Sequence, residues 1–259
     1  MAMNYVRRGS GKPLVLVHGL GSSHKAWCLV ALALSRHREV ITVDLPGHGE
    51  TPAEPDSGTF LGLARSLEAW LDAERLSSAD LVGSSLGGRL VLEMARRGRA
   101  GAVLALDPGG FWQGWERHFI ATSLLTSGLL LRSLRPLLPI LSHNAASRSA
   151  LLAQLTARPW DLNGDLVATE LQSFADTPTF DALVQDLAYG AAQEGFQTSS
   201  NKPVTIGWGR HDRLCFPAQA FRAQSVFPGS RLVWFERSGH FPMWEEPEKT
   251  VRTILEAVA

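Results

Sequence analysis

The stretch Gly83-Ser84-Ser85-Leu86-Gly87-Gly88 follows directly on the run Asp80-Leu81-Val82. Its first five residues fit the pattern G-x-S-x-G, which describes a sharp turn between a strand and a helix with a nucleophile at its apex. Ser85 would occupy this apex in a strained conformation, with its hydroxyl exposed. Glycines are expected on both sides because side chains there would collide with the neighbouring strand and helix. The stretch therefore predicts a nucleophilic serine.

Apolar runs alternate with helical patterns on both sides of this turn. Such an alternation favours an α/β fold with a mostly parallel sheet flanked by helices. The predicted strands are 14–17, 40–43, 81–82, 103–106, 204–206 and 232–235. The predicted helices are 24–35, 60–75, 86–97 and 246–258.

The alternation stops between Gly110 and about residue 200, where helical patterns occur without a clear strand. Residues 197–201 read Gln-Thr-Ser-Ser-Asn, which is typical of a loop that returns the chain to the sheet. We therefore expect a core of residues 1–110 and 199–259, and a helical insertion, or cap, over residues 111–198. The tryptophans of the insertion either form its own core or line an apolar pocket between cap and sheet: Trp112, Trp115 and Trp160.

A serine hydroxyl needs a neighbouring base, and the base needs a third group that orients it. Among eight histidines, His240 fits best, because it follows Gly239 just past the strand predicted at 232–235. Asp212 lies past another predicted strand and precedes His240, as the order Ser, Asp, His requires for a turn of this kind. Asp107 also ends a predicted strand and is the rival for the acid.

A reaction at an acyl carbon also needs two backbone N–H donors for the developing oxyanion. One donor is expected from Leu86, the residue after the nucleophile. The other is expected from Leu20, in the glycine-containing loop His18-Gly19-Leu20-Gly21 that follows the first long strand. His18 is expected to shape this loop rather than to transfer protons.

Four segments occur in one order along the chain: Leu16 to Gly21, Asp44-Leu45-Pro46-Gly47-His48-Gly49, Gly83 to Gly88, and Gly209 to Asp212 together with Ser238 to His240. In these segments the chain resembles the cap-bearing branch of the α/β-hydrolase family, which holds esterases, haloperoxidase-like proteins and meta-cleavage-product hydrolases. The resemblance implies an α/β-hydrolase fold with the helical cap inserted after the sixth strand. It also implies that Ser85 is the nucleophile, Asp212 the acid, His240 the base, and Leu20 and Leu86 the oxyanion donors. A serine at the turn separates the chain from the dehalogenases and epoxide hydrolases, which carry aspartate there.

Three functions follow from these residues. The first is a carboxylic-ester hydrolase that acts on an apolar or aromatic small molecule, since the insertion is rich in leucine and tryptophan. The second is hydrolysis of a carbon–carbon bond in a vinylogous diketone, for which Arg89, Arg117 or Arg148 could hold an acidic group. Without such a role, Arg89 is expected on the surface of its helix. The third is a binding protein that uses the fold without catalysis.

Composition limits the partners. Lys and Arg together number 25, as do Asp and Glu, so the net charge of zero indicates neither nucleic acid nor an anionic membrane as a partner. No metal-ligand spacing is present and the third glycine of a dinucleotide loop is replaced by His24, so we expect no metal and no cofactor. No pattern indicates a particular oligomeric state.

Residues 124–141 are leucine-rich, but arginines and prolines interrupt them, so we expect no stable membrane span. The first residues lack the apolar stretch of a signal peptide. Cys28 and Cys215 are expected to be free thiols, as in a reducing compartment. Together these features predict a cytoplasmic protein.

Overall fold

The computed structural model describes residues 3–196 and 202–259. These residues form a seven-stranded sheet in the order β1-β3-β2-β4-β5-β6-β7, with neighbouring strands parallel except β1 and β3. The strands are β1 (Tyr5–Arg8), β2 (Pro13–Val17), β3 (Glu39–Val43), β4 (Asp80–Ser84), β5 (Val103–Leu106), β6 (Val204–Gly209) and β7 (Arg231–Phe235). The predicted loop at 197–201, with the domain boundary drawn through it, lies outside the described residues.

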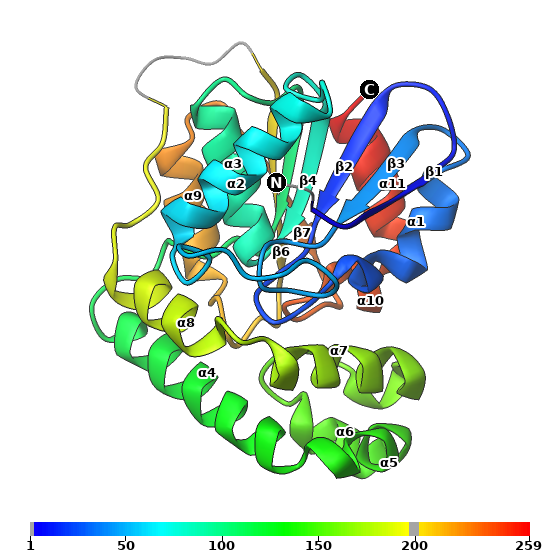
Figure 1. The fold of residues 1–259 in the computed structure, drawn as a ribbon, viewed down its shortest axis with the longest axis vertical. Coiled ribbons are helices and arrows are strands. Elements are labelled where there is room, and N and C mark those ends of the chain that lie inside the picture. Colours follow the sequence, from blue (N-terminus) through cyan, green and yellow to red (C-terminus); the bar gives the residue numbers. More distant parts are fainter. Residues whose placement is uncertain (1–2, 197–201) are drawn as a thin grey trace.

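Helices cover both faces of the sheet (Figure 1). On one face lie α2 (Phe60–Ala73), α3 (Leu86–Arg96) and α9 (Ala218–Val226). On the other lie α1 (Cys28–Leu34), which continues the short helix η1 (His24–Trp27), and α11 (Pro247–Ala257), which follows α10 (Pro242–Glu245). This arrangement is the predicted α/β architecture.

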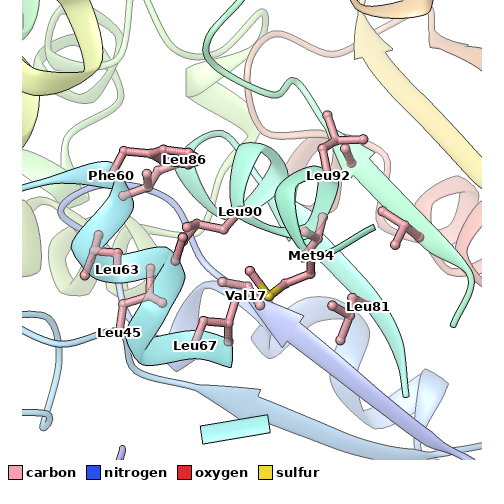
Figure 2. Close-up of a cluster of buried hydrophobic side chains, with 14 of the residues drawn as sticks. Val17, Leu45, Phe60, Leu63, Leu67, Leu81, Leu86, Leu90, Leu92 and Met94 are labelled. Atoms are coloured by element: carbon pink, nitrogen blue, oxygen red, sulfur yellow. The ribbon is translucent and has the colours of Figure 1, made fainter. Parts of the chain in front are cut away.

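The core under α2 and α3 shows why these segments are helices (Figure 2). Leu63 and Leu67 lie one helical turn apart in α2, and Leu90 and Met94 have the same spacing in α3. Residues four apart share one face of a helix, so each pair points inward. All four side chains are buried with Val17 of β2, so burial of apolar surface fixes these helices against the sheet.

The register of the parallel strands brings their carboxyl ends to one edge. Val17 at the end of β2 pairs with Gly83 of β4, and Ser84 pairs with Leu106 at the end of β5. Leu106 in turn pairs with Gly207 of β6. The loops that follow β2, β4, β5 and β6 therefore open at the same edge, where ligands of open α/β sheets bind.

A helical segment, defined here as residues 111–196, connects β5 to β6 and lies beyond one end of the strands (Figure 1). Its helices are α4 (Trp115–Ser133), η2 (Arg135–Leu137), α5 (Leu138–His143), α6 (Ala145–Leu151), η3 (Pro159–Asp161), α7 (Gly164–Asp176) and α8 (Phe180–Tyr189). The segment follows the fifth strand, which corrects the expectation that it follows a sixth. Five strands of the described chain, β1 to β5, precede it.

All six predicted strands are present, while β1 and α9 were not predicted. The sequence of β1 is Tyr-Val-Arg-Arg, and its residues are half-buried or exposed because it is an edge strand paired only with β3. The helix α9 buries only Gln219, Ala220 and Ala223, and it exposes the apolar Phe221. Both elements therefore lack the strong apolar periodicity from which the others were predicted.

In the part of the chain that the structure describes, no single helix is long and apolar enough to cross a membrane. Trp115–Ser133 and Arg135–His143 meet the length and composition criteria only as a pair, and the chain bends by 69° between them.

Candidate active site

Ser85 lies at the turn between β4 and α3 with φ 55° and ψ −114°, in the left-handed region that L-residues rarely adopt. A Cβ on Gly83 would lie 2.1 Å from the carbonyl oxygen of Gly87. A Cβ on Gly87 would lie 2.2 Å from the carbonyl oxygen of Val17. The turn thus needs glycine at both positions, as the pattern predicted, and it presents Ser85 as the N-cap of α3 with no capping hydrogen bond from its side chain.

The loop after β2 packs directly on Ser85. A Cβ on Gly19 would come within 3.2 Å of the Cβ of Ser85, which is tighter than most Cβ contacts, so glycine favours this close approach. The backbone N–H groups of Leu20 and Leu86, the predicted oxyanion donors, donate to no protein acceptor within residues 3–196 and 202–259. Two free donors thus occur on the two segments that meet at Ser85.

His18 holds this loop in place. Its Nε2 accepts a hydrogen bond from the backbone N–H of Leu45 at 3.0 Å, so Nδ1 carries the proton and donates to the carbonyl of Gly19 at 2.7 Å. Both ring nitrogens are therefore used in a neutral tautomer, and burial lowers the pKa of His18 to about 4. His18 shapes the loop, as the sequence suggested.

His240 and Asp212 meet as the sequence predicted. Nδ1 of His240 donates to Oδ2 of Asp212 at 2.7 Å, and both side chains are buried. Oδ1 of Asp212 accepts from the backbone N–H groups of Leu214 and Cys215, which fixes the carboxylate. Nε2 of His240 has no hydrogen-bond partner in the described part of the chain. The imidazole is thus oriented through one nitrogen, while the other stays free for a reacting group.

Asp107, the rival acid, is also buried beside this pair, with φ 44°. Its Oδ1 accepts the backbone N–H of Gly209 at 2.8 Å, and its Oδ2 has no partner among the described residues. Burial raises the pKa of Asp107 well above its usual range, and the nearby Asp212 raises it further. A raised pKa makes Asp107 less ready to carry a charge, which favours Asp212, the carboxylate bonded to His240, as the acid.

The loop that carries His240 is held by residues that sequence reasoning missed. Oε2 of Glu245 accepts the backbone N–H of Gly239 at 2.6 Å, and its Oε1 accepts those of Ala157 and Arg158 in the helical segment. The backbone N–H of His240 donates to the carbonyl of Leu155 at 2.7 Å. The only signal in the sequence is an acidic pair shortly after His240, which is too common to single out.

Four of the site residues line one pocket between the sheet and the helical segment, with a cavity volume of about 70 Å³. Its lining includes Ser85, His240, Leu20 and Leu86, and most of its other members are apolar. Over the described residues, the whole lining contains five polar side chains, those of Ser22, Ser85, Arg89, Glu170 and His240. Such a pocket, apolar with few polar groups, is the usual form of a small-molecule site.

For two of the three tryptophans, the structure contradicts the expectation that they line the pocket. Trp112 is 6% exposed and lines the pocket. Trp115 is 65% exposed and packs on Phe119 and Phe216, and Trp160 is 55% exposed. Neither belongs to the pocket lining. The physical reason is that both residues occupy outward-facing positions, Trp115 at the first turn of α4 and Trp160 in η3.

Of the three arginines considered for an acidic substrate, only Arg89 lines the pocket. It was expected on the helix surface but is 2% exposed, because its helix is buried on all sides at this turn. Its Nη1 has no partner among the described residues, and burial lowers its pKa to about 10, so it stays a cation at neutral pH. Arg148 is bound by the carbonyls of Pro159, Ser142 and Trp160 instead.

Both cysteines are free thiols, as predicted. Within the described residues, one group of metal-ligating types comes together: Asp212, Cys215 and His240, with ligand atoms within 4.8 Å of one another. The donor set suits a metal poorly, because Asp212 and His240 already bind each other and burial raises the pKa of Cys215, which keeps the thiol protonated.

Acid should destabilise the protein through two buried histidines. The rings of His18 and His48 lie 5.2 Å apart, and burial lowers their pKa values to about 4 and about 3. In the unfolded chain these two histidines bind protons near pH 6.5, whereas in the folded chain they stay neutral at that pH. The free energy of unfolding therefore falls as pH drops below 6.5. Glu170 acts in the opposite direction between about pH 7 and 4.5, because burial raises its pKa to about 7.

A His48→Asn variant tests this expectation, since the asparagine amide can still donate to the carbonyl of Pro46, the partner of Nδ1 of His48. Urea unfolding between pH 6.5 and 5 should show a slope shallower by about 1.4 kcal/mol per pH unit, the effect of one proton. Equal slopes in the variant and the wild type would contradict the assigned neutrality of His48.

Comparison with known proteins agrees with this geometry. A sequence model described as the alpha/beta hydrolase family matches residues 14–253. A 2-hydroxy-6-oxononadienedioate/2-hydroxy-6-oxononatrienedioate hydrolase from Burkholderia vietnamiensis is 27% identical over 273 residues, covering 99% of this chain and 90% of that protein. An uncharacterized protein of Mycobacterium tuberculosis is 27% identical over 258 residues, covering 95% of this chain and 75% of that protein. An esterase structure from Exiguobacterium antarcticum has a TM-score of 0.81 at 18% identity, covering 99% and 95%, and so shares the fold.

Proposed function

Because the chain belongs to the alpha/beta hydrolase family, we propose that it is a serine hydrolase that cleaves an apolar or aromatic carboxylic ester. Ser85 is its nucleophile, His240 its base and Asp212 the acid that orients the base. The observation that carries the proposal is the buried hydrogen bond from His240 to Asp212, together with the free Nε2 of His240 in the pocket that Ser85 also lines.

The first half of the reaction forms an acyl-enzyme. Ser85 Oγ attacks the acyl carbon while Nε2 of His240 takes its proton. Asp212 stabilises the imidazolium through the existing hydrogen bond to Nδ1, and the N–H groups of Leu20 and Leu86 bind the oxyanion. His240 then gives the proton to the leaving alcohol.

The second half regenerates the enzyme. His240 takes a proton from water, which attacks the acyl carbon of the acyl-enzyme, and the same two N–H groups bind the second oxyanion. Collapse of this intermediate releases the acid and returns the proton to Ser85. No step requires a metal or a cofactor.

The pocket supports an apolar substrate. Leucine and phenylalanine side chains from α4, α7 and α8 face the sheet edge across it, with Trp112 at its wall. We propose that residues 111–198 form a cap over a core of residues 1–110 and 199–259, and that the cap selects the substrate. Burial of apolar groups then supplies binding at about 25 cal/mol per Å².

Hydrolysis of a carbon–carbon bond next to a ketone is the second candidate. Arg89 favours it, because this residue lines the pocket, is a cation, and has an Nη1 without a partner among the described residues that could bind a carboxylate. The relative from Burkholderia vietnamiensis bears the name of such a hydrolase. The same Ser85 and His240 would serve this reaction.

A substrate panel separates the candidates. Wild-type protein is given a chain-length series of p-nitrophenyl and naphthyl esters, and in parallel a vinylogous diketone acid, with labelling of Ser85 by a fluorophosphonate probe as the measure of an active serine. We expect labelling and a kcat/KM that rises with acyl length, because longer chains bury more apolar surface.

Turnover of the diketone acid alone would replace the ester proposal with the second candidate. In that case Arg89→Met should raise KM for the diketone acid strongly, and it should leave KM for neutral esters little changed. Failure of the probe to label Ser85 would indicate a binding protein instead of an enzyme.

A further inference from the structure

Glu170 occupies a position where an apolar residue is expected. The face of α7 that lines the pocket consists of Val167, Glu170, Leu171 and Phe174, at the i, i+3, i+4 and i+7 spacing of one helical stripe. Glu170 is only 6% exposed. A carboxyl group therefore stands in the apolar wall of the pocket that Ser85 and His240 line.

Only one oxygen of this carboxyl has a protein partner. Oε2 accepts the hydroxyl of Ser22 at 2.6 Å, whereas Oε1 is buried without a partner within residues 3–196 and 202–259. Nε2 of His240 is in the same state on the same pocket. An unpaired buried polar atom costs about 1–3 kcal/mol, so natural proteins rarely keep one without a use.

Ser22 does not explain the carboxyl. The Ser22–Glu170 hydrogen bond ties α7 to the loop after β2, two residues beyond Leu20. A glutamine could accept the same hydroxyl without the cost of burying an acid, which raises the pKa of Glu170 to about 7. The second oxygen is therefore the part of this carboxyl group that no protein partner accounts for among the described residues.

We propose that Glu170 is a specificity-determining residue whose Oε1 accepts a hydrogen bond from a hydroxyl group of the substrate. The inference rests on the proposed function and narrows its substrate class to apolar esters that carry a hydroxyl group away from the scissile bond. A neutral hydroxyl is favoured over an ammonium, because the lining of the pocket is mostly apolar and a charged group is costly to bury there.

Pairs of esters that differ by one hydroxyl test this inference. The hydroxyl is moved along the acyl chain in one series and along the alcohol in another, and each ester is paired with its deoxy counterpart and its amine analogue. Two quantities are measured: the ratio of kcat/KM within each pair for active protein, and the ratio of Kd within each pair for Ser85→Ala protein, which binds without turnover.

We expect one hydroxyl position to be preferred over its deoxy counterpart on the order of tenfold to a hundredfold in both ratios. Glu170→Leu should bring that preference close to one, and Glu170→Gln should lower it to an intermediate value. Ser22→Ala breaks the tie to α7 but keeps the carboxyl, so the preference should persist. Asp165→Asn, an exposed change from carboxylate to amide on the same helix, is the matched control and should leave both ratios unchanged.

Several outcomes would overturn the inference. These are no hydroxyl preference at any position, a preference that Glu170→Leu retains, or a preference that Ser22→Ala abolishes as fully as Glu170→Leu does. A Glu170-dependent preference for the amine analogue would mean that Glu170 binds a cation of the substrate and not a hydroxyl group. If esters are not hydrolysed but Ser85→Ala protein still shows the Glu170-dependent Kd ratio, the proposed reaction fails while this inference stands.

Discussion

Replacing Ser85 with alanine should lower kcat for ester hydrolysis by a factor on the order of 10⁴ or more. The substitution removes the atom that forms the acyl-enzyme, so any remaining rate comes from water bound near the oxyanion donors. KM should change little, because the apolar lining of the pocket stays the same. Steady-state kinetics with a p-nitrophenyl ester, at protein concentrations high enough to detect the residual rate, measure the effect.

Ser84→Ala is the matched control for this experiment. Ser84 precedes the nucleophile and is fully buried at the end of β4, and its Oγ has no partner among the described residues. Loss of this hydroxyl group should therefore leave kcat within about threefold of the wild-type value, since no hydrogen bond is broken. Near-normal turnover by Ser85→Ala, with both variants folded by their urea unfolding curves, would refute Ser85 as the nucleophile.

Replacing Asp212 with asparagine should lower kcat by a factor on the order of 10⁴. Nδ1 of His240 now donates to Oδ2 of Asp212 at 2.7 Å, which leaves Nε2 unprotonated and able to act as a base. An asparagine amide can turn its N–H toward Nδ1, which stabilises the wrong tautomer and removes the charge that balances the imidazolium. The kcat and its pH profile report both losses.

Asp107→Asn serves as the comparison, because Asp107 is the rival acid at the same sheet edge. Asp107 makes no hydrogen bond to His240 within the described residues, and burial raises its pKa, so an amide of the same shape at this position should lower kcat by less than tenfold. The reverse result, a large loss in Asp107→Asn and a small one in Asp212→Asn, would transfer the role of the acid to Asp107.

Much of the fold could be predicted because its strongest signals are local. Strands buried on both faces, such as β2 and β5, read as apolar runs, and the turn at Ser85 leaves its own glycines in the sequence. The edge strand β1 and the helix α9 were missed because their burial is partial. The candidate site followed from the same logic, since Asp212 and His240 come just after strands whose carboxyl ends meet.

Other parts of the site could not be predicted because they depend on how separate elements pack. Arg89 was expected at the surface, and only the contact of its helix with the sheet and the helical segment shows it buried in the pocket. Trp115 and Trp160 share a residue type and a segment with Trp112, yet only Trp112 faces inward. The role of Glu245 depends on a contact between residues nearly ninety positions apart.

The backbone turn at Ser85 and the order of the residues around it can be predicted from local sequence, because steric limits on a tight turn act over a few neighbouring residues. Which side chains enter the pocket depends on how separate elements pack. Glu170 illustrates the difference: in the sequence it is one acid among many, and only the packing of α7 against the loop after β2 buries it beside the candidate site. The sequence lists every residue around a helix, and the elements that pack against the helix decide which of its faces lines the pocket.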